Sequence, residues 1–406
     1  MPENTAVKMN SVGVILADDL TGACDSAVRI LDKHRRVAVL LSSHPVSFNG
    51  YSYISVNSNT RSLDPEEGTA RIRQILKSVR ALNGEIRYKK IDSMLRGNIL
   101  PELELLKEEL GYDCVLIAPG YPENNRIVLD GYLYPEGLHS PVSCKVSEAL
   151  GLEEKSVCLT HELLKNGPED TRRFLEEKYR EGFRYFIGDS ADSEDLETLA
   201  ETLRRTGLKV LPSGSGGLVR YVFREETKGG SVMPAPAFDD QRIAYIVGSG
   251  NPVTVEQVQR LLRKPGVAAD AIDLKDAEVS KEWRSLAVTT SRVIKGDPVC
   301  AKTVTSNISN REIETELSAR AKELYKDGVR KMVVTGGDTA NVVLNSLGFS
   351  EIEILCESEP GVVLGIGRGE NLEPLCVVTK SGGFGTPEAF VKLEKILRNE
   401  KGEEHV

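Results

Sequence analysis

The fold is decided by the stretch SVGVILADDLTGACDSAVRIL, residues 11–31. It begins with a short apolar run rich in β-branched residues, which is typical of a buried strand, and continues into a helical pattern at 21–31. Between the two lie adjacent carboxylates, Asp18 and Asp19, at the carboxyl end of the predicted strand. Ligands of open α/β sheets bind at this end, so the stretch predicts a fold class and the position of a site.

The same alternation of strand and helix patterns continues outward from this stretch. Strand-like runs follow at 36–41, 85–92, 113–119 and 183–190, with helical patterns at 99–110 and 194–207. Such layering predicts an α/β fold with a mostly parallel or mixed sheet flanked by helices.

The length of 406 residues exceeds what one hydrophobic core usually supports, so we expect two domains. The stretch 229–241 is rich in Gly and Pro and has the composition of an exposed linker. We therefore predict a first domain at 1–230, a linker at 231–241, and a second α/β domain at 242–406 whose strand patterns resume at 243–250. An active site in the cleft between the domains follows from this arrangement.

The composition excludes several classes of protein. A formal net charge of -9 argues against nucleic acid as the main partner, because phosphate binding needs a concentrated basic surface. No apolar run approaches the ~18 residues of a membrane span, and the N-terminus does not resemble a signal peptide, so we expect no membrane partner and a cytoplasmic protein. The seven cysteines include no C-x-x-C pair, which predicts reduced and mostly buried thiols.

Three glycine-containing turns follow strand-like runs in the second domain, at 248–252 (GSGNP), 335–339 (TGGDT) and 380–385 (KSGGFG). Glycine lets an anion approach the backbone, and the free amides and dipole of a helix N-terminus favour phosphate. One such turn is explained equally well as a tight strand-to-helix connection, but three in one domain predict a nucleotide site. Asp338 is the candidate ligand for Mg²⁺, and Lys380 is a candidate for neutralising phosphate charge.

Neither a G-x-x-x-x-G-K-[ST] P-loop nor a clean G-x-G-x-x-G fingerprint occurs in the chain. Their absence argues against a P-loop NTPase and against a Rossmann dehydrogenase. The nucleotide site predicted from the three turns is therefore of another kind.

The first domain carries a set of charged candidates at strand ends. Asp18 or Asp19 could accept a proton from an attacking hydroxyl or bind a substrate hydroxyl, although a helix N-cap explains one of the two. Arg61 and Arg96 suit a planar carboxylate, and Asp92 is a second candidate for a base or a metal contact. For Lys89 and Lys90 a surface ion pair is the simpler explanation. Arg126 ends a long polar stretch, 118–126, that is typical of the border of an active site.

Taken together and in this order, the motifs resemble the four-carbon acid sugar kinase family over nearly the whole chain. The motifs are ILADDLTGACD, SNTR, KKIDSMLRGN, APGYPENNR, DGYLY, GSGNPVTVEQ, TGGDTA and KSGGFG. The resemblance implies an N-terminal substrate domain, a C-terminal nucleotide domain, and transfer of phosphate from ATP to the terminal hydroxyl of D-threonate, D-erythronate or a 3-oxo-tetronate. The expected partner is thus a small-molecule sugar acid, with a homodimer as the open alternative to a monomer.

Matched residue by residue, the resemblance implies substrate contacts at Asp19, at Arg61 and in the loop that holds Lys90, Asp92, Ser93 and Arg96. It implies ATP contacts at Ser249, Gly336, Gly337, Asp338, Thr339, Gly382 and Gly383. Two positions depart from the pattern of the family: Met94 stands where a threonine is expected, and Asn125 where a glycine is expected.

We therefore predict in-line phosphoryl transfer with Mg²⁺ near Asp338, Lys380 on the nucleotide, and Asp19 ranked above Asp92 as the base. Two alternatives stay open: a dehydrogenase of similar acids, and a non-catalytic sensor that binds nucleotide or sugar acid.

Overall fold

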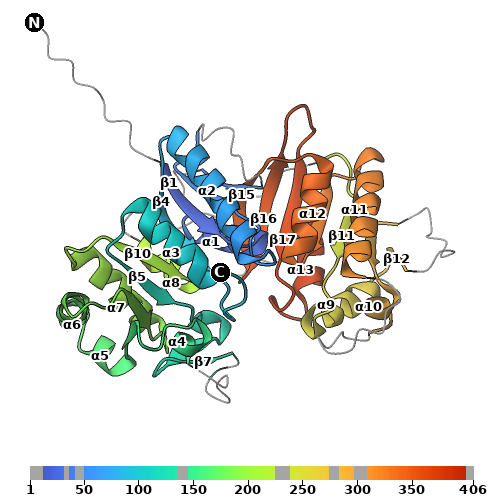
Figure 1. The fold of residues 1–406 in the computed structure, drawn as a ribbon. Helices are drawn as coiled ribbons and strands as arrows, with labels where there is room; N and C mark the ends of the chain where they lie inside the picture. Colours follow the sequence, from blue (N-terminus) through green and yellow to red (C-terminus); the bar gives the residue numbers. More distant parts are fainter. Residues whose placement is uncertain are drawn as a thin grey trace, which may run out of the picture.

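The computed structural model describes residues 12–31, 36–41, 50–135, 137, 145–224, 238–273, 283–296 and 309–398. Within them the chain forms two α/β halves that lie side by side (Figure 1). The predicted fold class is confirmed. Most of the predicted linker, at 231–237, falls outside the described residues, so the boundary between the domains stays a prediction.

The N-terminal half is built on eight parallel strands in the order β2-β3-β1-β4-β10-β5-β9-β8. A separate two-stranded hairpin, β6 with β7, borders them. The strands are β1 (Val12–Ala17), β2 (Val37–Leu40), β3 (Tyr53–Asn57), β4 (Gly84–Lys90), β5 (Cys114–Ala118), β6 (Ile127–Leu129), β7 (Tyr132–Tyr134), β8 (Ser156–Leu159), β9 (Tyr185–Gly188) and β10 (Val210–Gly214).

Helices cover both faces of this sheet, as a parallel sheet requires. One face packs against α1 (Leu20–Arg29), α5 (His161–Lys165), α6 (Pro168–Arg180), α7 (Ser193–Arg205) and α8 (Gly216–Val222). The other face packs against α2 (Pro65–Ala81), α3 (Ile99–Leu110) and α4 (Val146–Ala149), and a short 3₁₀ turn, η1 (Pro122–Asn124), follows β5.

The C-terminal half is a mixed sheet in the order β12-β13-β11-β14-β17-β16-β15, in which β15 and β16 run antiparallel to their neighbours. Its strands are β11 (Ile243–Val247), β12 (Val267–Ala271), β13 (Ser285–Thr289), β14 (Lys331–Thr335), β15 (Glu351–Glu359), β16 (Val362–Arg368) and β17 (Leu375–Lys380). Its helices are α9 (Pro252–Leu262), α10 (Ser291–Lys295), α11 (Asn310–Lys326), α12 (Gly337–Leu347) and α13 (Ala389–Leu397).

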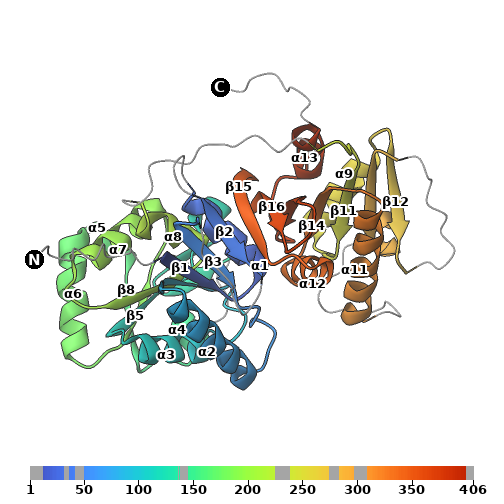
Figure 2. The ribbon, with the colours of Figure 1, turned by 90° about the horizontal axis from the view of Figure 1, so that it is seen from above.

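The two sheets are joined at their edges, which the sequence did not predict. Strand β15 pairs antiparallel with β2, so the strands form one continuous sheet of 15 (Figure 2). One apolar core also continues across the junction, because residues of α1 and α8 share a cluster with residues of α11 and α12. The two halves are therefore joined both by backbone hydrogen bonds and by a shared apolar core.

Helix α1 lies at this junction and contacts α12 as well as β15, β16 and β17 (Figure 1). Two polar contacts, one buried and one partly buried, also join the halves here. Asn57 donates to Asn341 Oδ1 over 2.9 Å, and Arg29 Nη2 lies 2.7 Å from Glu357 Oε1. Since Arg29 belongs to α1 and Glu357 to β15, this ion pair fixes the helix that begins at Asp19 against the second half.

Lys89 and Lys90 are not surface residues, so that expectation is wrong. Both are buried, and Lys89 Nζ forms an ion pair of 2.5 Å with Glu102 Oε2 of α3. The reason is the position of β4 inside the sheet, with strands on both sides and α3 packed on its face.

Breaking this buried pair should be costly. Lys89→Met leaves the Glu102 carboxylate buried without its partner, and we expect the free energy of unfolding to fall by about 3 kcal/mol. Urea denaturation followed by circular dichroism measures the change. The matched control is Lys165→Met, whose exposed pairs with Asp192 and Glu194 should contribute less than about 1 kcal/mol. Equal losses in the two variants would contradict the prediction.

The described cysteines are all free thiols, four of them buried and Cys158 partly so, as predicted. Among the described residues, no helix is long and apolar enough to cross a membrane.

Candidate active site

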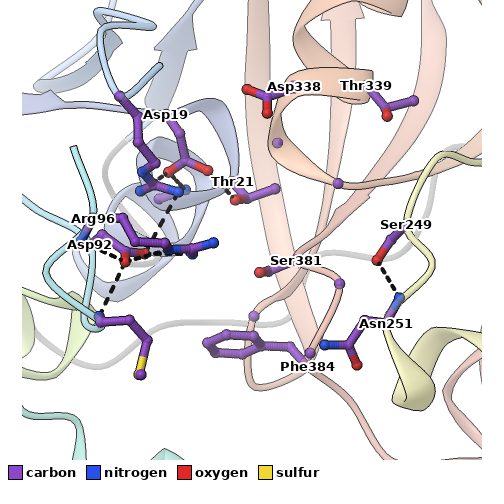
Figure 3. A pocket seen from close by; sticks show the side chains of 18 of the residues that line it. Asp19, Thr21, Asp92, Arg96, Ser249, Asn251, Asp338, Thr339, Ser381 and Phe384 are labelled. Carbon is purple, nitrogen blue, oxygen red and sulfur yellow. Dashed lines mark hydrogen bonds and ion pairs between the residues drawn. The ribbon is translucent and has the colours of Figure 1, made fainter. Parts of the chain in front are cut away.

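A polar cleft of about 800 Å³ lies between the halves, at the carboxyl ends of strands from both. Its N-terminal wall consists of the lining residues between positions 19 and 135, and its C-terminal wall of those between 248 and 384. Asp19, Thr21 and Arg96 face Ser249, Asp338 and Thr339 across the gap (Figure 3). The candidates predicted separately in the two domains are thus brought to one place.

Asp18 and Asp19 follow β1 and have different roles. Asp19 caps α1, because its Oδ1 accepts from the Gly22 amide over 2.9 Å. The guanidinium of Arg61 binds Asp18 with two hydrogen bonds, of 2.9 and 2.8 Å, and reaches Asp19 Oδ1 at 2.8 Å. Asp18 does not line the cleft, so it acts by orienting Arg61 and is not placed to contact a ligand.

The carboxylate of Asp19 is ionised although it is buried. Burial alone would raise its pKa, but Arg61, Lys90 and hydrogen bonds from Thr21 and Gly22 lower it below the usual value. The hydroxyl of Thr21 donates to Oδ2 over 2.6 Å. Asp19 is therefore a fixed negative charge at the N-terminus of α1.

Asp92 begins a tight loop after β4. Its Oδ2 accepts from the backbone amides of Met94 and Arg96, and Arg96 binds the carboxylate with two further bonds, Nε at 2.7 Å and Nη2 at 2.8 Å. Burial opposes ionisation, but these bonds and Arg61 hold the pKa of Asp92 well below its usual range. Asp92 accepts four hydrogen bonds and Asp19 three, so Asp92 is less free than Asp19 to meet a ligand.

Two cations, Lys90 and Arg126, and the neutral hydroxyl of Ser93 complete the N-terminal wall. Lys90 Nζ donates to the Ile91 carbonyl over 2.9 Å. Arg126 hydrogen-bonds to Ser93 Oγ and stacks over the Phe384 ring, with 5.1 Å between its guanidinium carbon and the ring centroid. Because Phe384 belongs to the C-terminal half, Arg126 spans the cleft.

The C-terminal wall is made by the three predicted glycine turns, which follow β11, β14 and β17. They touch one another: a Cβ added at Gly248 would collide with Thr339, and one added at Gly382 would collide with Ser249. A Cβ at Gly337 would collide with the Asp19 carboxylate in the opposite wall. Glycine is thus required where the turns and the two halves approach closely.

Lys380 is placed differently from the prediction. Its ammonium is buried beneath the third turn and does not line the cleft. It donates to Thr254 Oγ1 and to the carbonyls of Ser381, Gly382 and Phe384, at 2.9 to 3.2 Å. The reason is that the Lys380 ammonium is the hydrogen-bond donor to these oxygens on the inner side of the third turn. Lys380 therefore stabilises the conformation of this turn and makes no direct contact with the cleft.

This placement predicts a pH dependence of nucleotide binding. Burial lowers the pKa of Lys380 to about 7, so the ammonium loses its proton as the pH rises through neutrality and the turn loses a donor. The Km for nucleotide should rise above about pH 7, and Lys380→Met should raise it about tenfold and remove this pH step. The control is Lys392→Met, an exposed lysine paired with Glu359. A pH step that persists in Lys380→Met would refute the assignment.

Asp338 lies in the first turn of α12 and faces the cleft. Burial, and then the charge of Asp19, raise its pKa. Glu314 of α11 also lines the cleft, and burial and then the charge of Asp338 raise its pKa. Among the described residues no basic side chain forms an ion pair with Asp338. Such a carboxylate, next to glycine turns at helix N-termini, fits the way Mg²⁺ is held by one or two carboxylates and substrate phosphates.

The sequence did not single out several of the lining residues, among them Thr21, Asp25, Glu314 and Phe384. Thr21 and Asp25 lie in the motif ILADDLTGACD, and their positions on the first turns of α1 could have identified them. Glu314 sits in an ordinary charged helix pattern that carries no such signal.

The two departures from the family pattern are both at or near the cleft. Met94 lines it. Asn125 has a left-handed backbone, with φ of 56°, which explains why asparagine can stand where glycine is expected.

Comparison with known sequences divides the chain between the same two halves that form the walls of the cleft. Residues 13–222 match the family described as sugar-binding N-terminal domain, and residues 244–390 match the nucleotide-binding C-terminal domain. The D-threonate kinase of Cupriavidus necator is 24% identical, over 93% of this chain and 96% of the relative. The 3-oxo-tetronate kinase of Pectobacterium atrosepticum is 26% identical, over 95% and 99%, and the D-erythronate kinase of Heliobacterium modesticaldum 23%, over 93% and 94%.

Solved structures share the fold. A crystal structure from Salmonella typhimurium LT2 superposes with a TM-score of 0.76 at 20% identity, covering 94% of this chain and 98% of the other. A Haemophilus influenzae protein of the DUF1537 family superposes with a TM-score of 0.71 at 22% identity, covering 95% and 100%. At these identities the likeness supports the fold alone.

Proposed function

This chain belongs to the family whose members join a sugar-binding N-terminal domain to a nucleotide-binding C-terminal domain, and from that membership we propose that it is a kinase for a four-carbon acid sugar. The donor is ATP, and the product is the 4-phosphate of D-threonate, D-erythronate or a 3-oxo-tetronate. These acceptors appear in the names of relatives that match more than nine-tenths of the chain.

One observation carries the proposal: the charged N-terminal wall and the glycine turns of the C-terminal wall face each other across one cleft (Figure 3). The contact between Gly337 and the Asp19 carboxylate brings the two walls together. An acceptor on one wall and a phosphate donor on the other would then meet at Asp19, as in-line transfer requires.

The N-terminal wall supports binding of a small hydroxy acid. The cations Arg61, Lys90 and Arg96 offer donors to a carboxylate, while Asp19, Asp92 and Ser93 offer partners to hydroxyl groups. Asp18, which does not line the cleft, orients Arg61 with two hydrogen bonds. A substrate of four carbons fits a wall in which these groups lie on three neighbouring strand ends.

The C-terminal wall supports binding of the nucleotide through its backbone. Gly336, Gly337 and Thr339 begin α12, Ser249 precedes α9, and Gly382 and Gly383 form the third turn. Their amides and the two helix N-termini suit phosphate oxygens. Asp338, which lacks a basic partner among the described residues, would hold Mg²⁺, and the ion would supply charge neutralisation on the phosphates.

Asp19 is the proposed group that orients the acceptor hydroxyl. Its Oδ1 is occupied by Gly22 and Arg61, whereas its Oδ2 bonds only to Thr21 among the described residues and faces Gly337. With a lowered pKa, Asp19 is ionised at neutral pH and can accept the hydrogen bond of the hydroxyl. Phosphoryl transfer asks mainly for positioning and electrostatic stabilisation, which such a group supplies.

A coupled ADP-release assay tests the proposal, with Mg-ATP and a panel of D-threonate, D-erythronate, their L forms, 3-oxo-tetronates and D-glycerate. We expect saturable turnover on one tetronate, and phosphorus NMR should place the phosphate on the terminal carbon. ATP binding without transfer to any acid would favour a sensor instead. Oxidation of such acids with NAD and without ATP would favour a dehydrogenase.

A further inference from the structure

The charges of the cleft are unevenly divided between its walls. Among the described residues of the C-terminal wall, the charged side chains are Glu314 and Asp338, both acidic, since Lys380 is turned beneath its loop. The basic side chains that line the cleft in the described part of the chain, Arg61, Lys90, Arg96 and Arg126, belong to the N-terminal wall. Among the described residues, a side-chain cation for a nucleoside triphosphate on the glycine turns would therefore come from the opposite wall.

The two other arginines of the N-terminal wall already have carboxylate partners. Arg61 binds the carboxylates of Asp18 and Asp19, and Arg96 binds both oxygens of Asp92. The positive charge of these two guanidinium groups is thus largely balanced by carboxylates of the same wall. Lys90 donates to the Ile91 carbonyl and belongs to the same wall as Asp19 and Asp92.

Arg126 differs from Arg61 and Arg96. Within the part of the chain that the structure describes, no carboxylate forms an ion pair with it, and its hydrogen bond goes to the neutral Ser93 hydroxyl. Burial, and next the like charge of Arg96, lower the pKa of Arg126, opposed by Asp92 and Asp25. A half-buried guanidinium without a counter-ion is a site that an anion would stabilise.

The position of Arg126 indicates which anion would bind to its guanidinium. Arg126 stacks on Phe384, which follows Gly382 and Gly383 in the third glycine turn, so it lies against the wall proposed for the nucleotide. Stacking uses the face of the guanidinium, so the N–H groups that do not bond to Ser93 can bind a planar or tetrahedral oxyanion. Ser93, at the other side, belongs to the wall proposed for the acceptor.

We propose that Arg126 binds the phosphoryl group during its transfer, at the junction of the two walls. This proposal rests on the proposed function. The acceptor hydroxyl oxygen forms a bond to the γ-phosphorus while the bond from that phosphorus to the β,γ-bridging oxygen breaks. ADP leaves with the electron pair of that bond, and the hydroxyl proton passes to Asp19. Arg126 donates to the equatorial oxygens, where the negative charge of the transferring group is spread.

The test separates this role from binding of the acceptor carboxylate. Arg126→Ala should lower kcat by about 10²-fold or more, with the Km of the acceptor changed less than about threefold. Arg126→Lys should recover little, because a lysine offers neither the stack nor the forked donors. Added guanidinium should partly restore the activity of Arg126→Ala, which a misfolded variant would not allow. Arg220→Ala, at an exposed arginine paired with Glu123, is the matched control and should match the wild type.

A second readout does not depend on the identity of the acceptor. Wild-type protein should bind ADP with aluminium fluoride, a mimic of the transferring phosphoryl group, more tightly than ADP alone, and Arg126→Ala should lose this gain while keeping its affinity for ADP. If Arg126→Ala instead raises the acceptor Km with kcat unchanged, or keeps the aluminium fluoride gain, the inference is wrong. Failure of the wild type on every acid would count against the proposed function and not against this assignment.

Discussion

Asp19→Asn should lower kcat by about 10³-fold while the fold is kept. The substitution leaves the size of the side chain and the N-cap of α1, because asparagine caps helices as well as aspartate does. It removes the negative charge that faces Gly337 and binds Arg61, so the acceptor hydroxyl loses its acceptor. The coupled ADP-release assay measures kcat, and circular dichroism checks the fold.

The matched control is Asp64→Asn, because Asp64 is also a helix N-cap but lies exposed at the start of α2, outside the cleft. We expect wild-type kinetics from it. Should Asp19→Asn retain more than about a tenth of the wild-type kcat, the orienting role would pass to Asp92, the other carboxylate of this wall.

Gly337→Ala should lower kcat by about 10²-fold with little change in stability. A Cβ at this position would collide with Asp19 Oδ2, so the two walls must separate or the carboxylate must turn away. A displacement of about 1 Å between reacting groups is enough for a loss of this size. The backbone of Gly337 is not in the left-handed region, so alanine is allowed there and the effect comes from the contact.

The control is Gly207→Ala, where an added Cβ meets nothing within 4 Å and the backbone is likewise not left-handed. Its activity and its urea denaturation should match those of the wild type. If Gly337→Ala keeps full activity, the two walls do not need the close approach seen in the structure, and the cleft would have to work in a more open form.

The sequence by itself determined the layered α/β architecture and most of the candidate residues. Strand and helix patterns, glycine turns and helix caps are local features, since backbone sterics and the periods of side chains act over a few residues. The carboxyl end of β1 could therefore be predicted as one side of the cleft from residues 11–31, and the three glycine turns could be predicted to lie in one place, which the structure shows to be the C-terminal wall.

Only the tertiary structure decided which way these side chains point and what they meet. Lys380 lies beneath its loop, where it donates hydrogen bonds to carbonyls that the fold brings there. Asp18 lies outside the lining of the cleft and binds Arg61, which is more than 40 positions away in the chain. The pairing of β2 with β15 likewise joins residues some 310 positions apart, for example Leu40 with Glu351. Contacts between residues so far apart in the chain leave no periodic trace in the sequence, because they depend on shape and charge assembled from both halves.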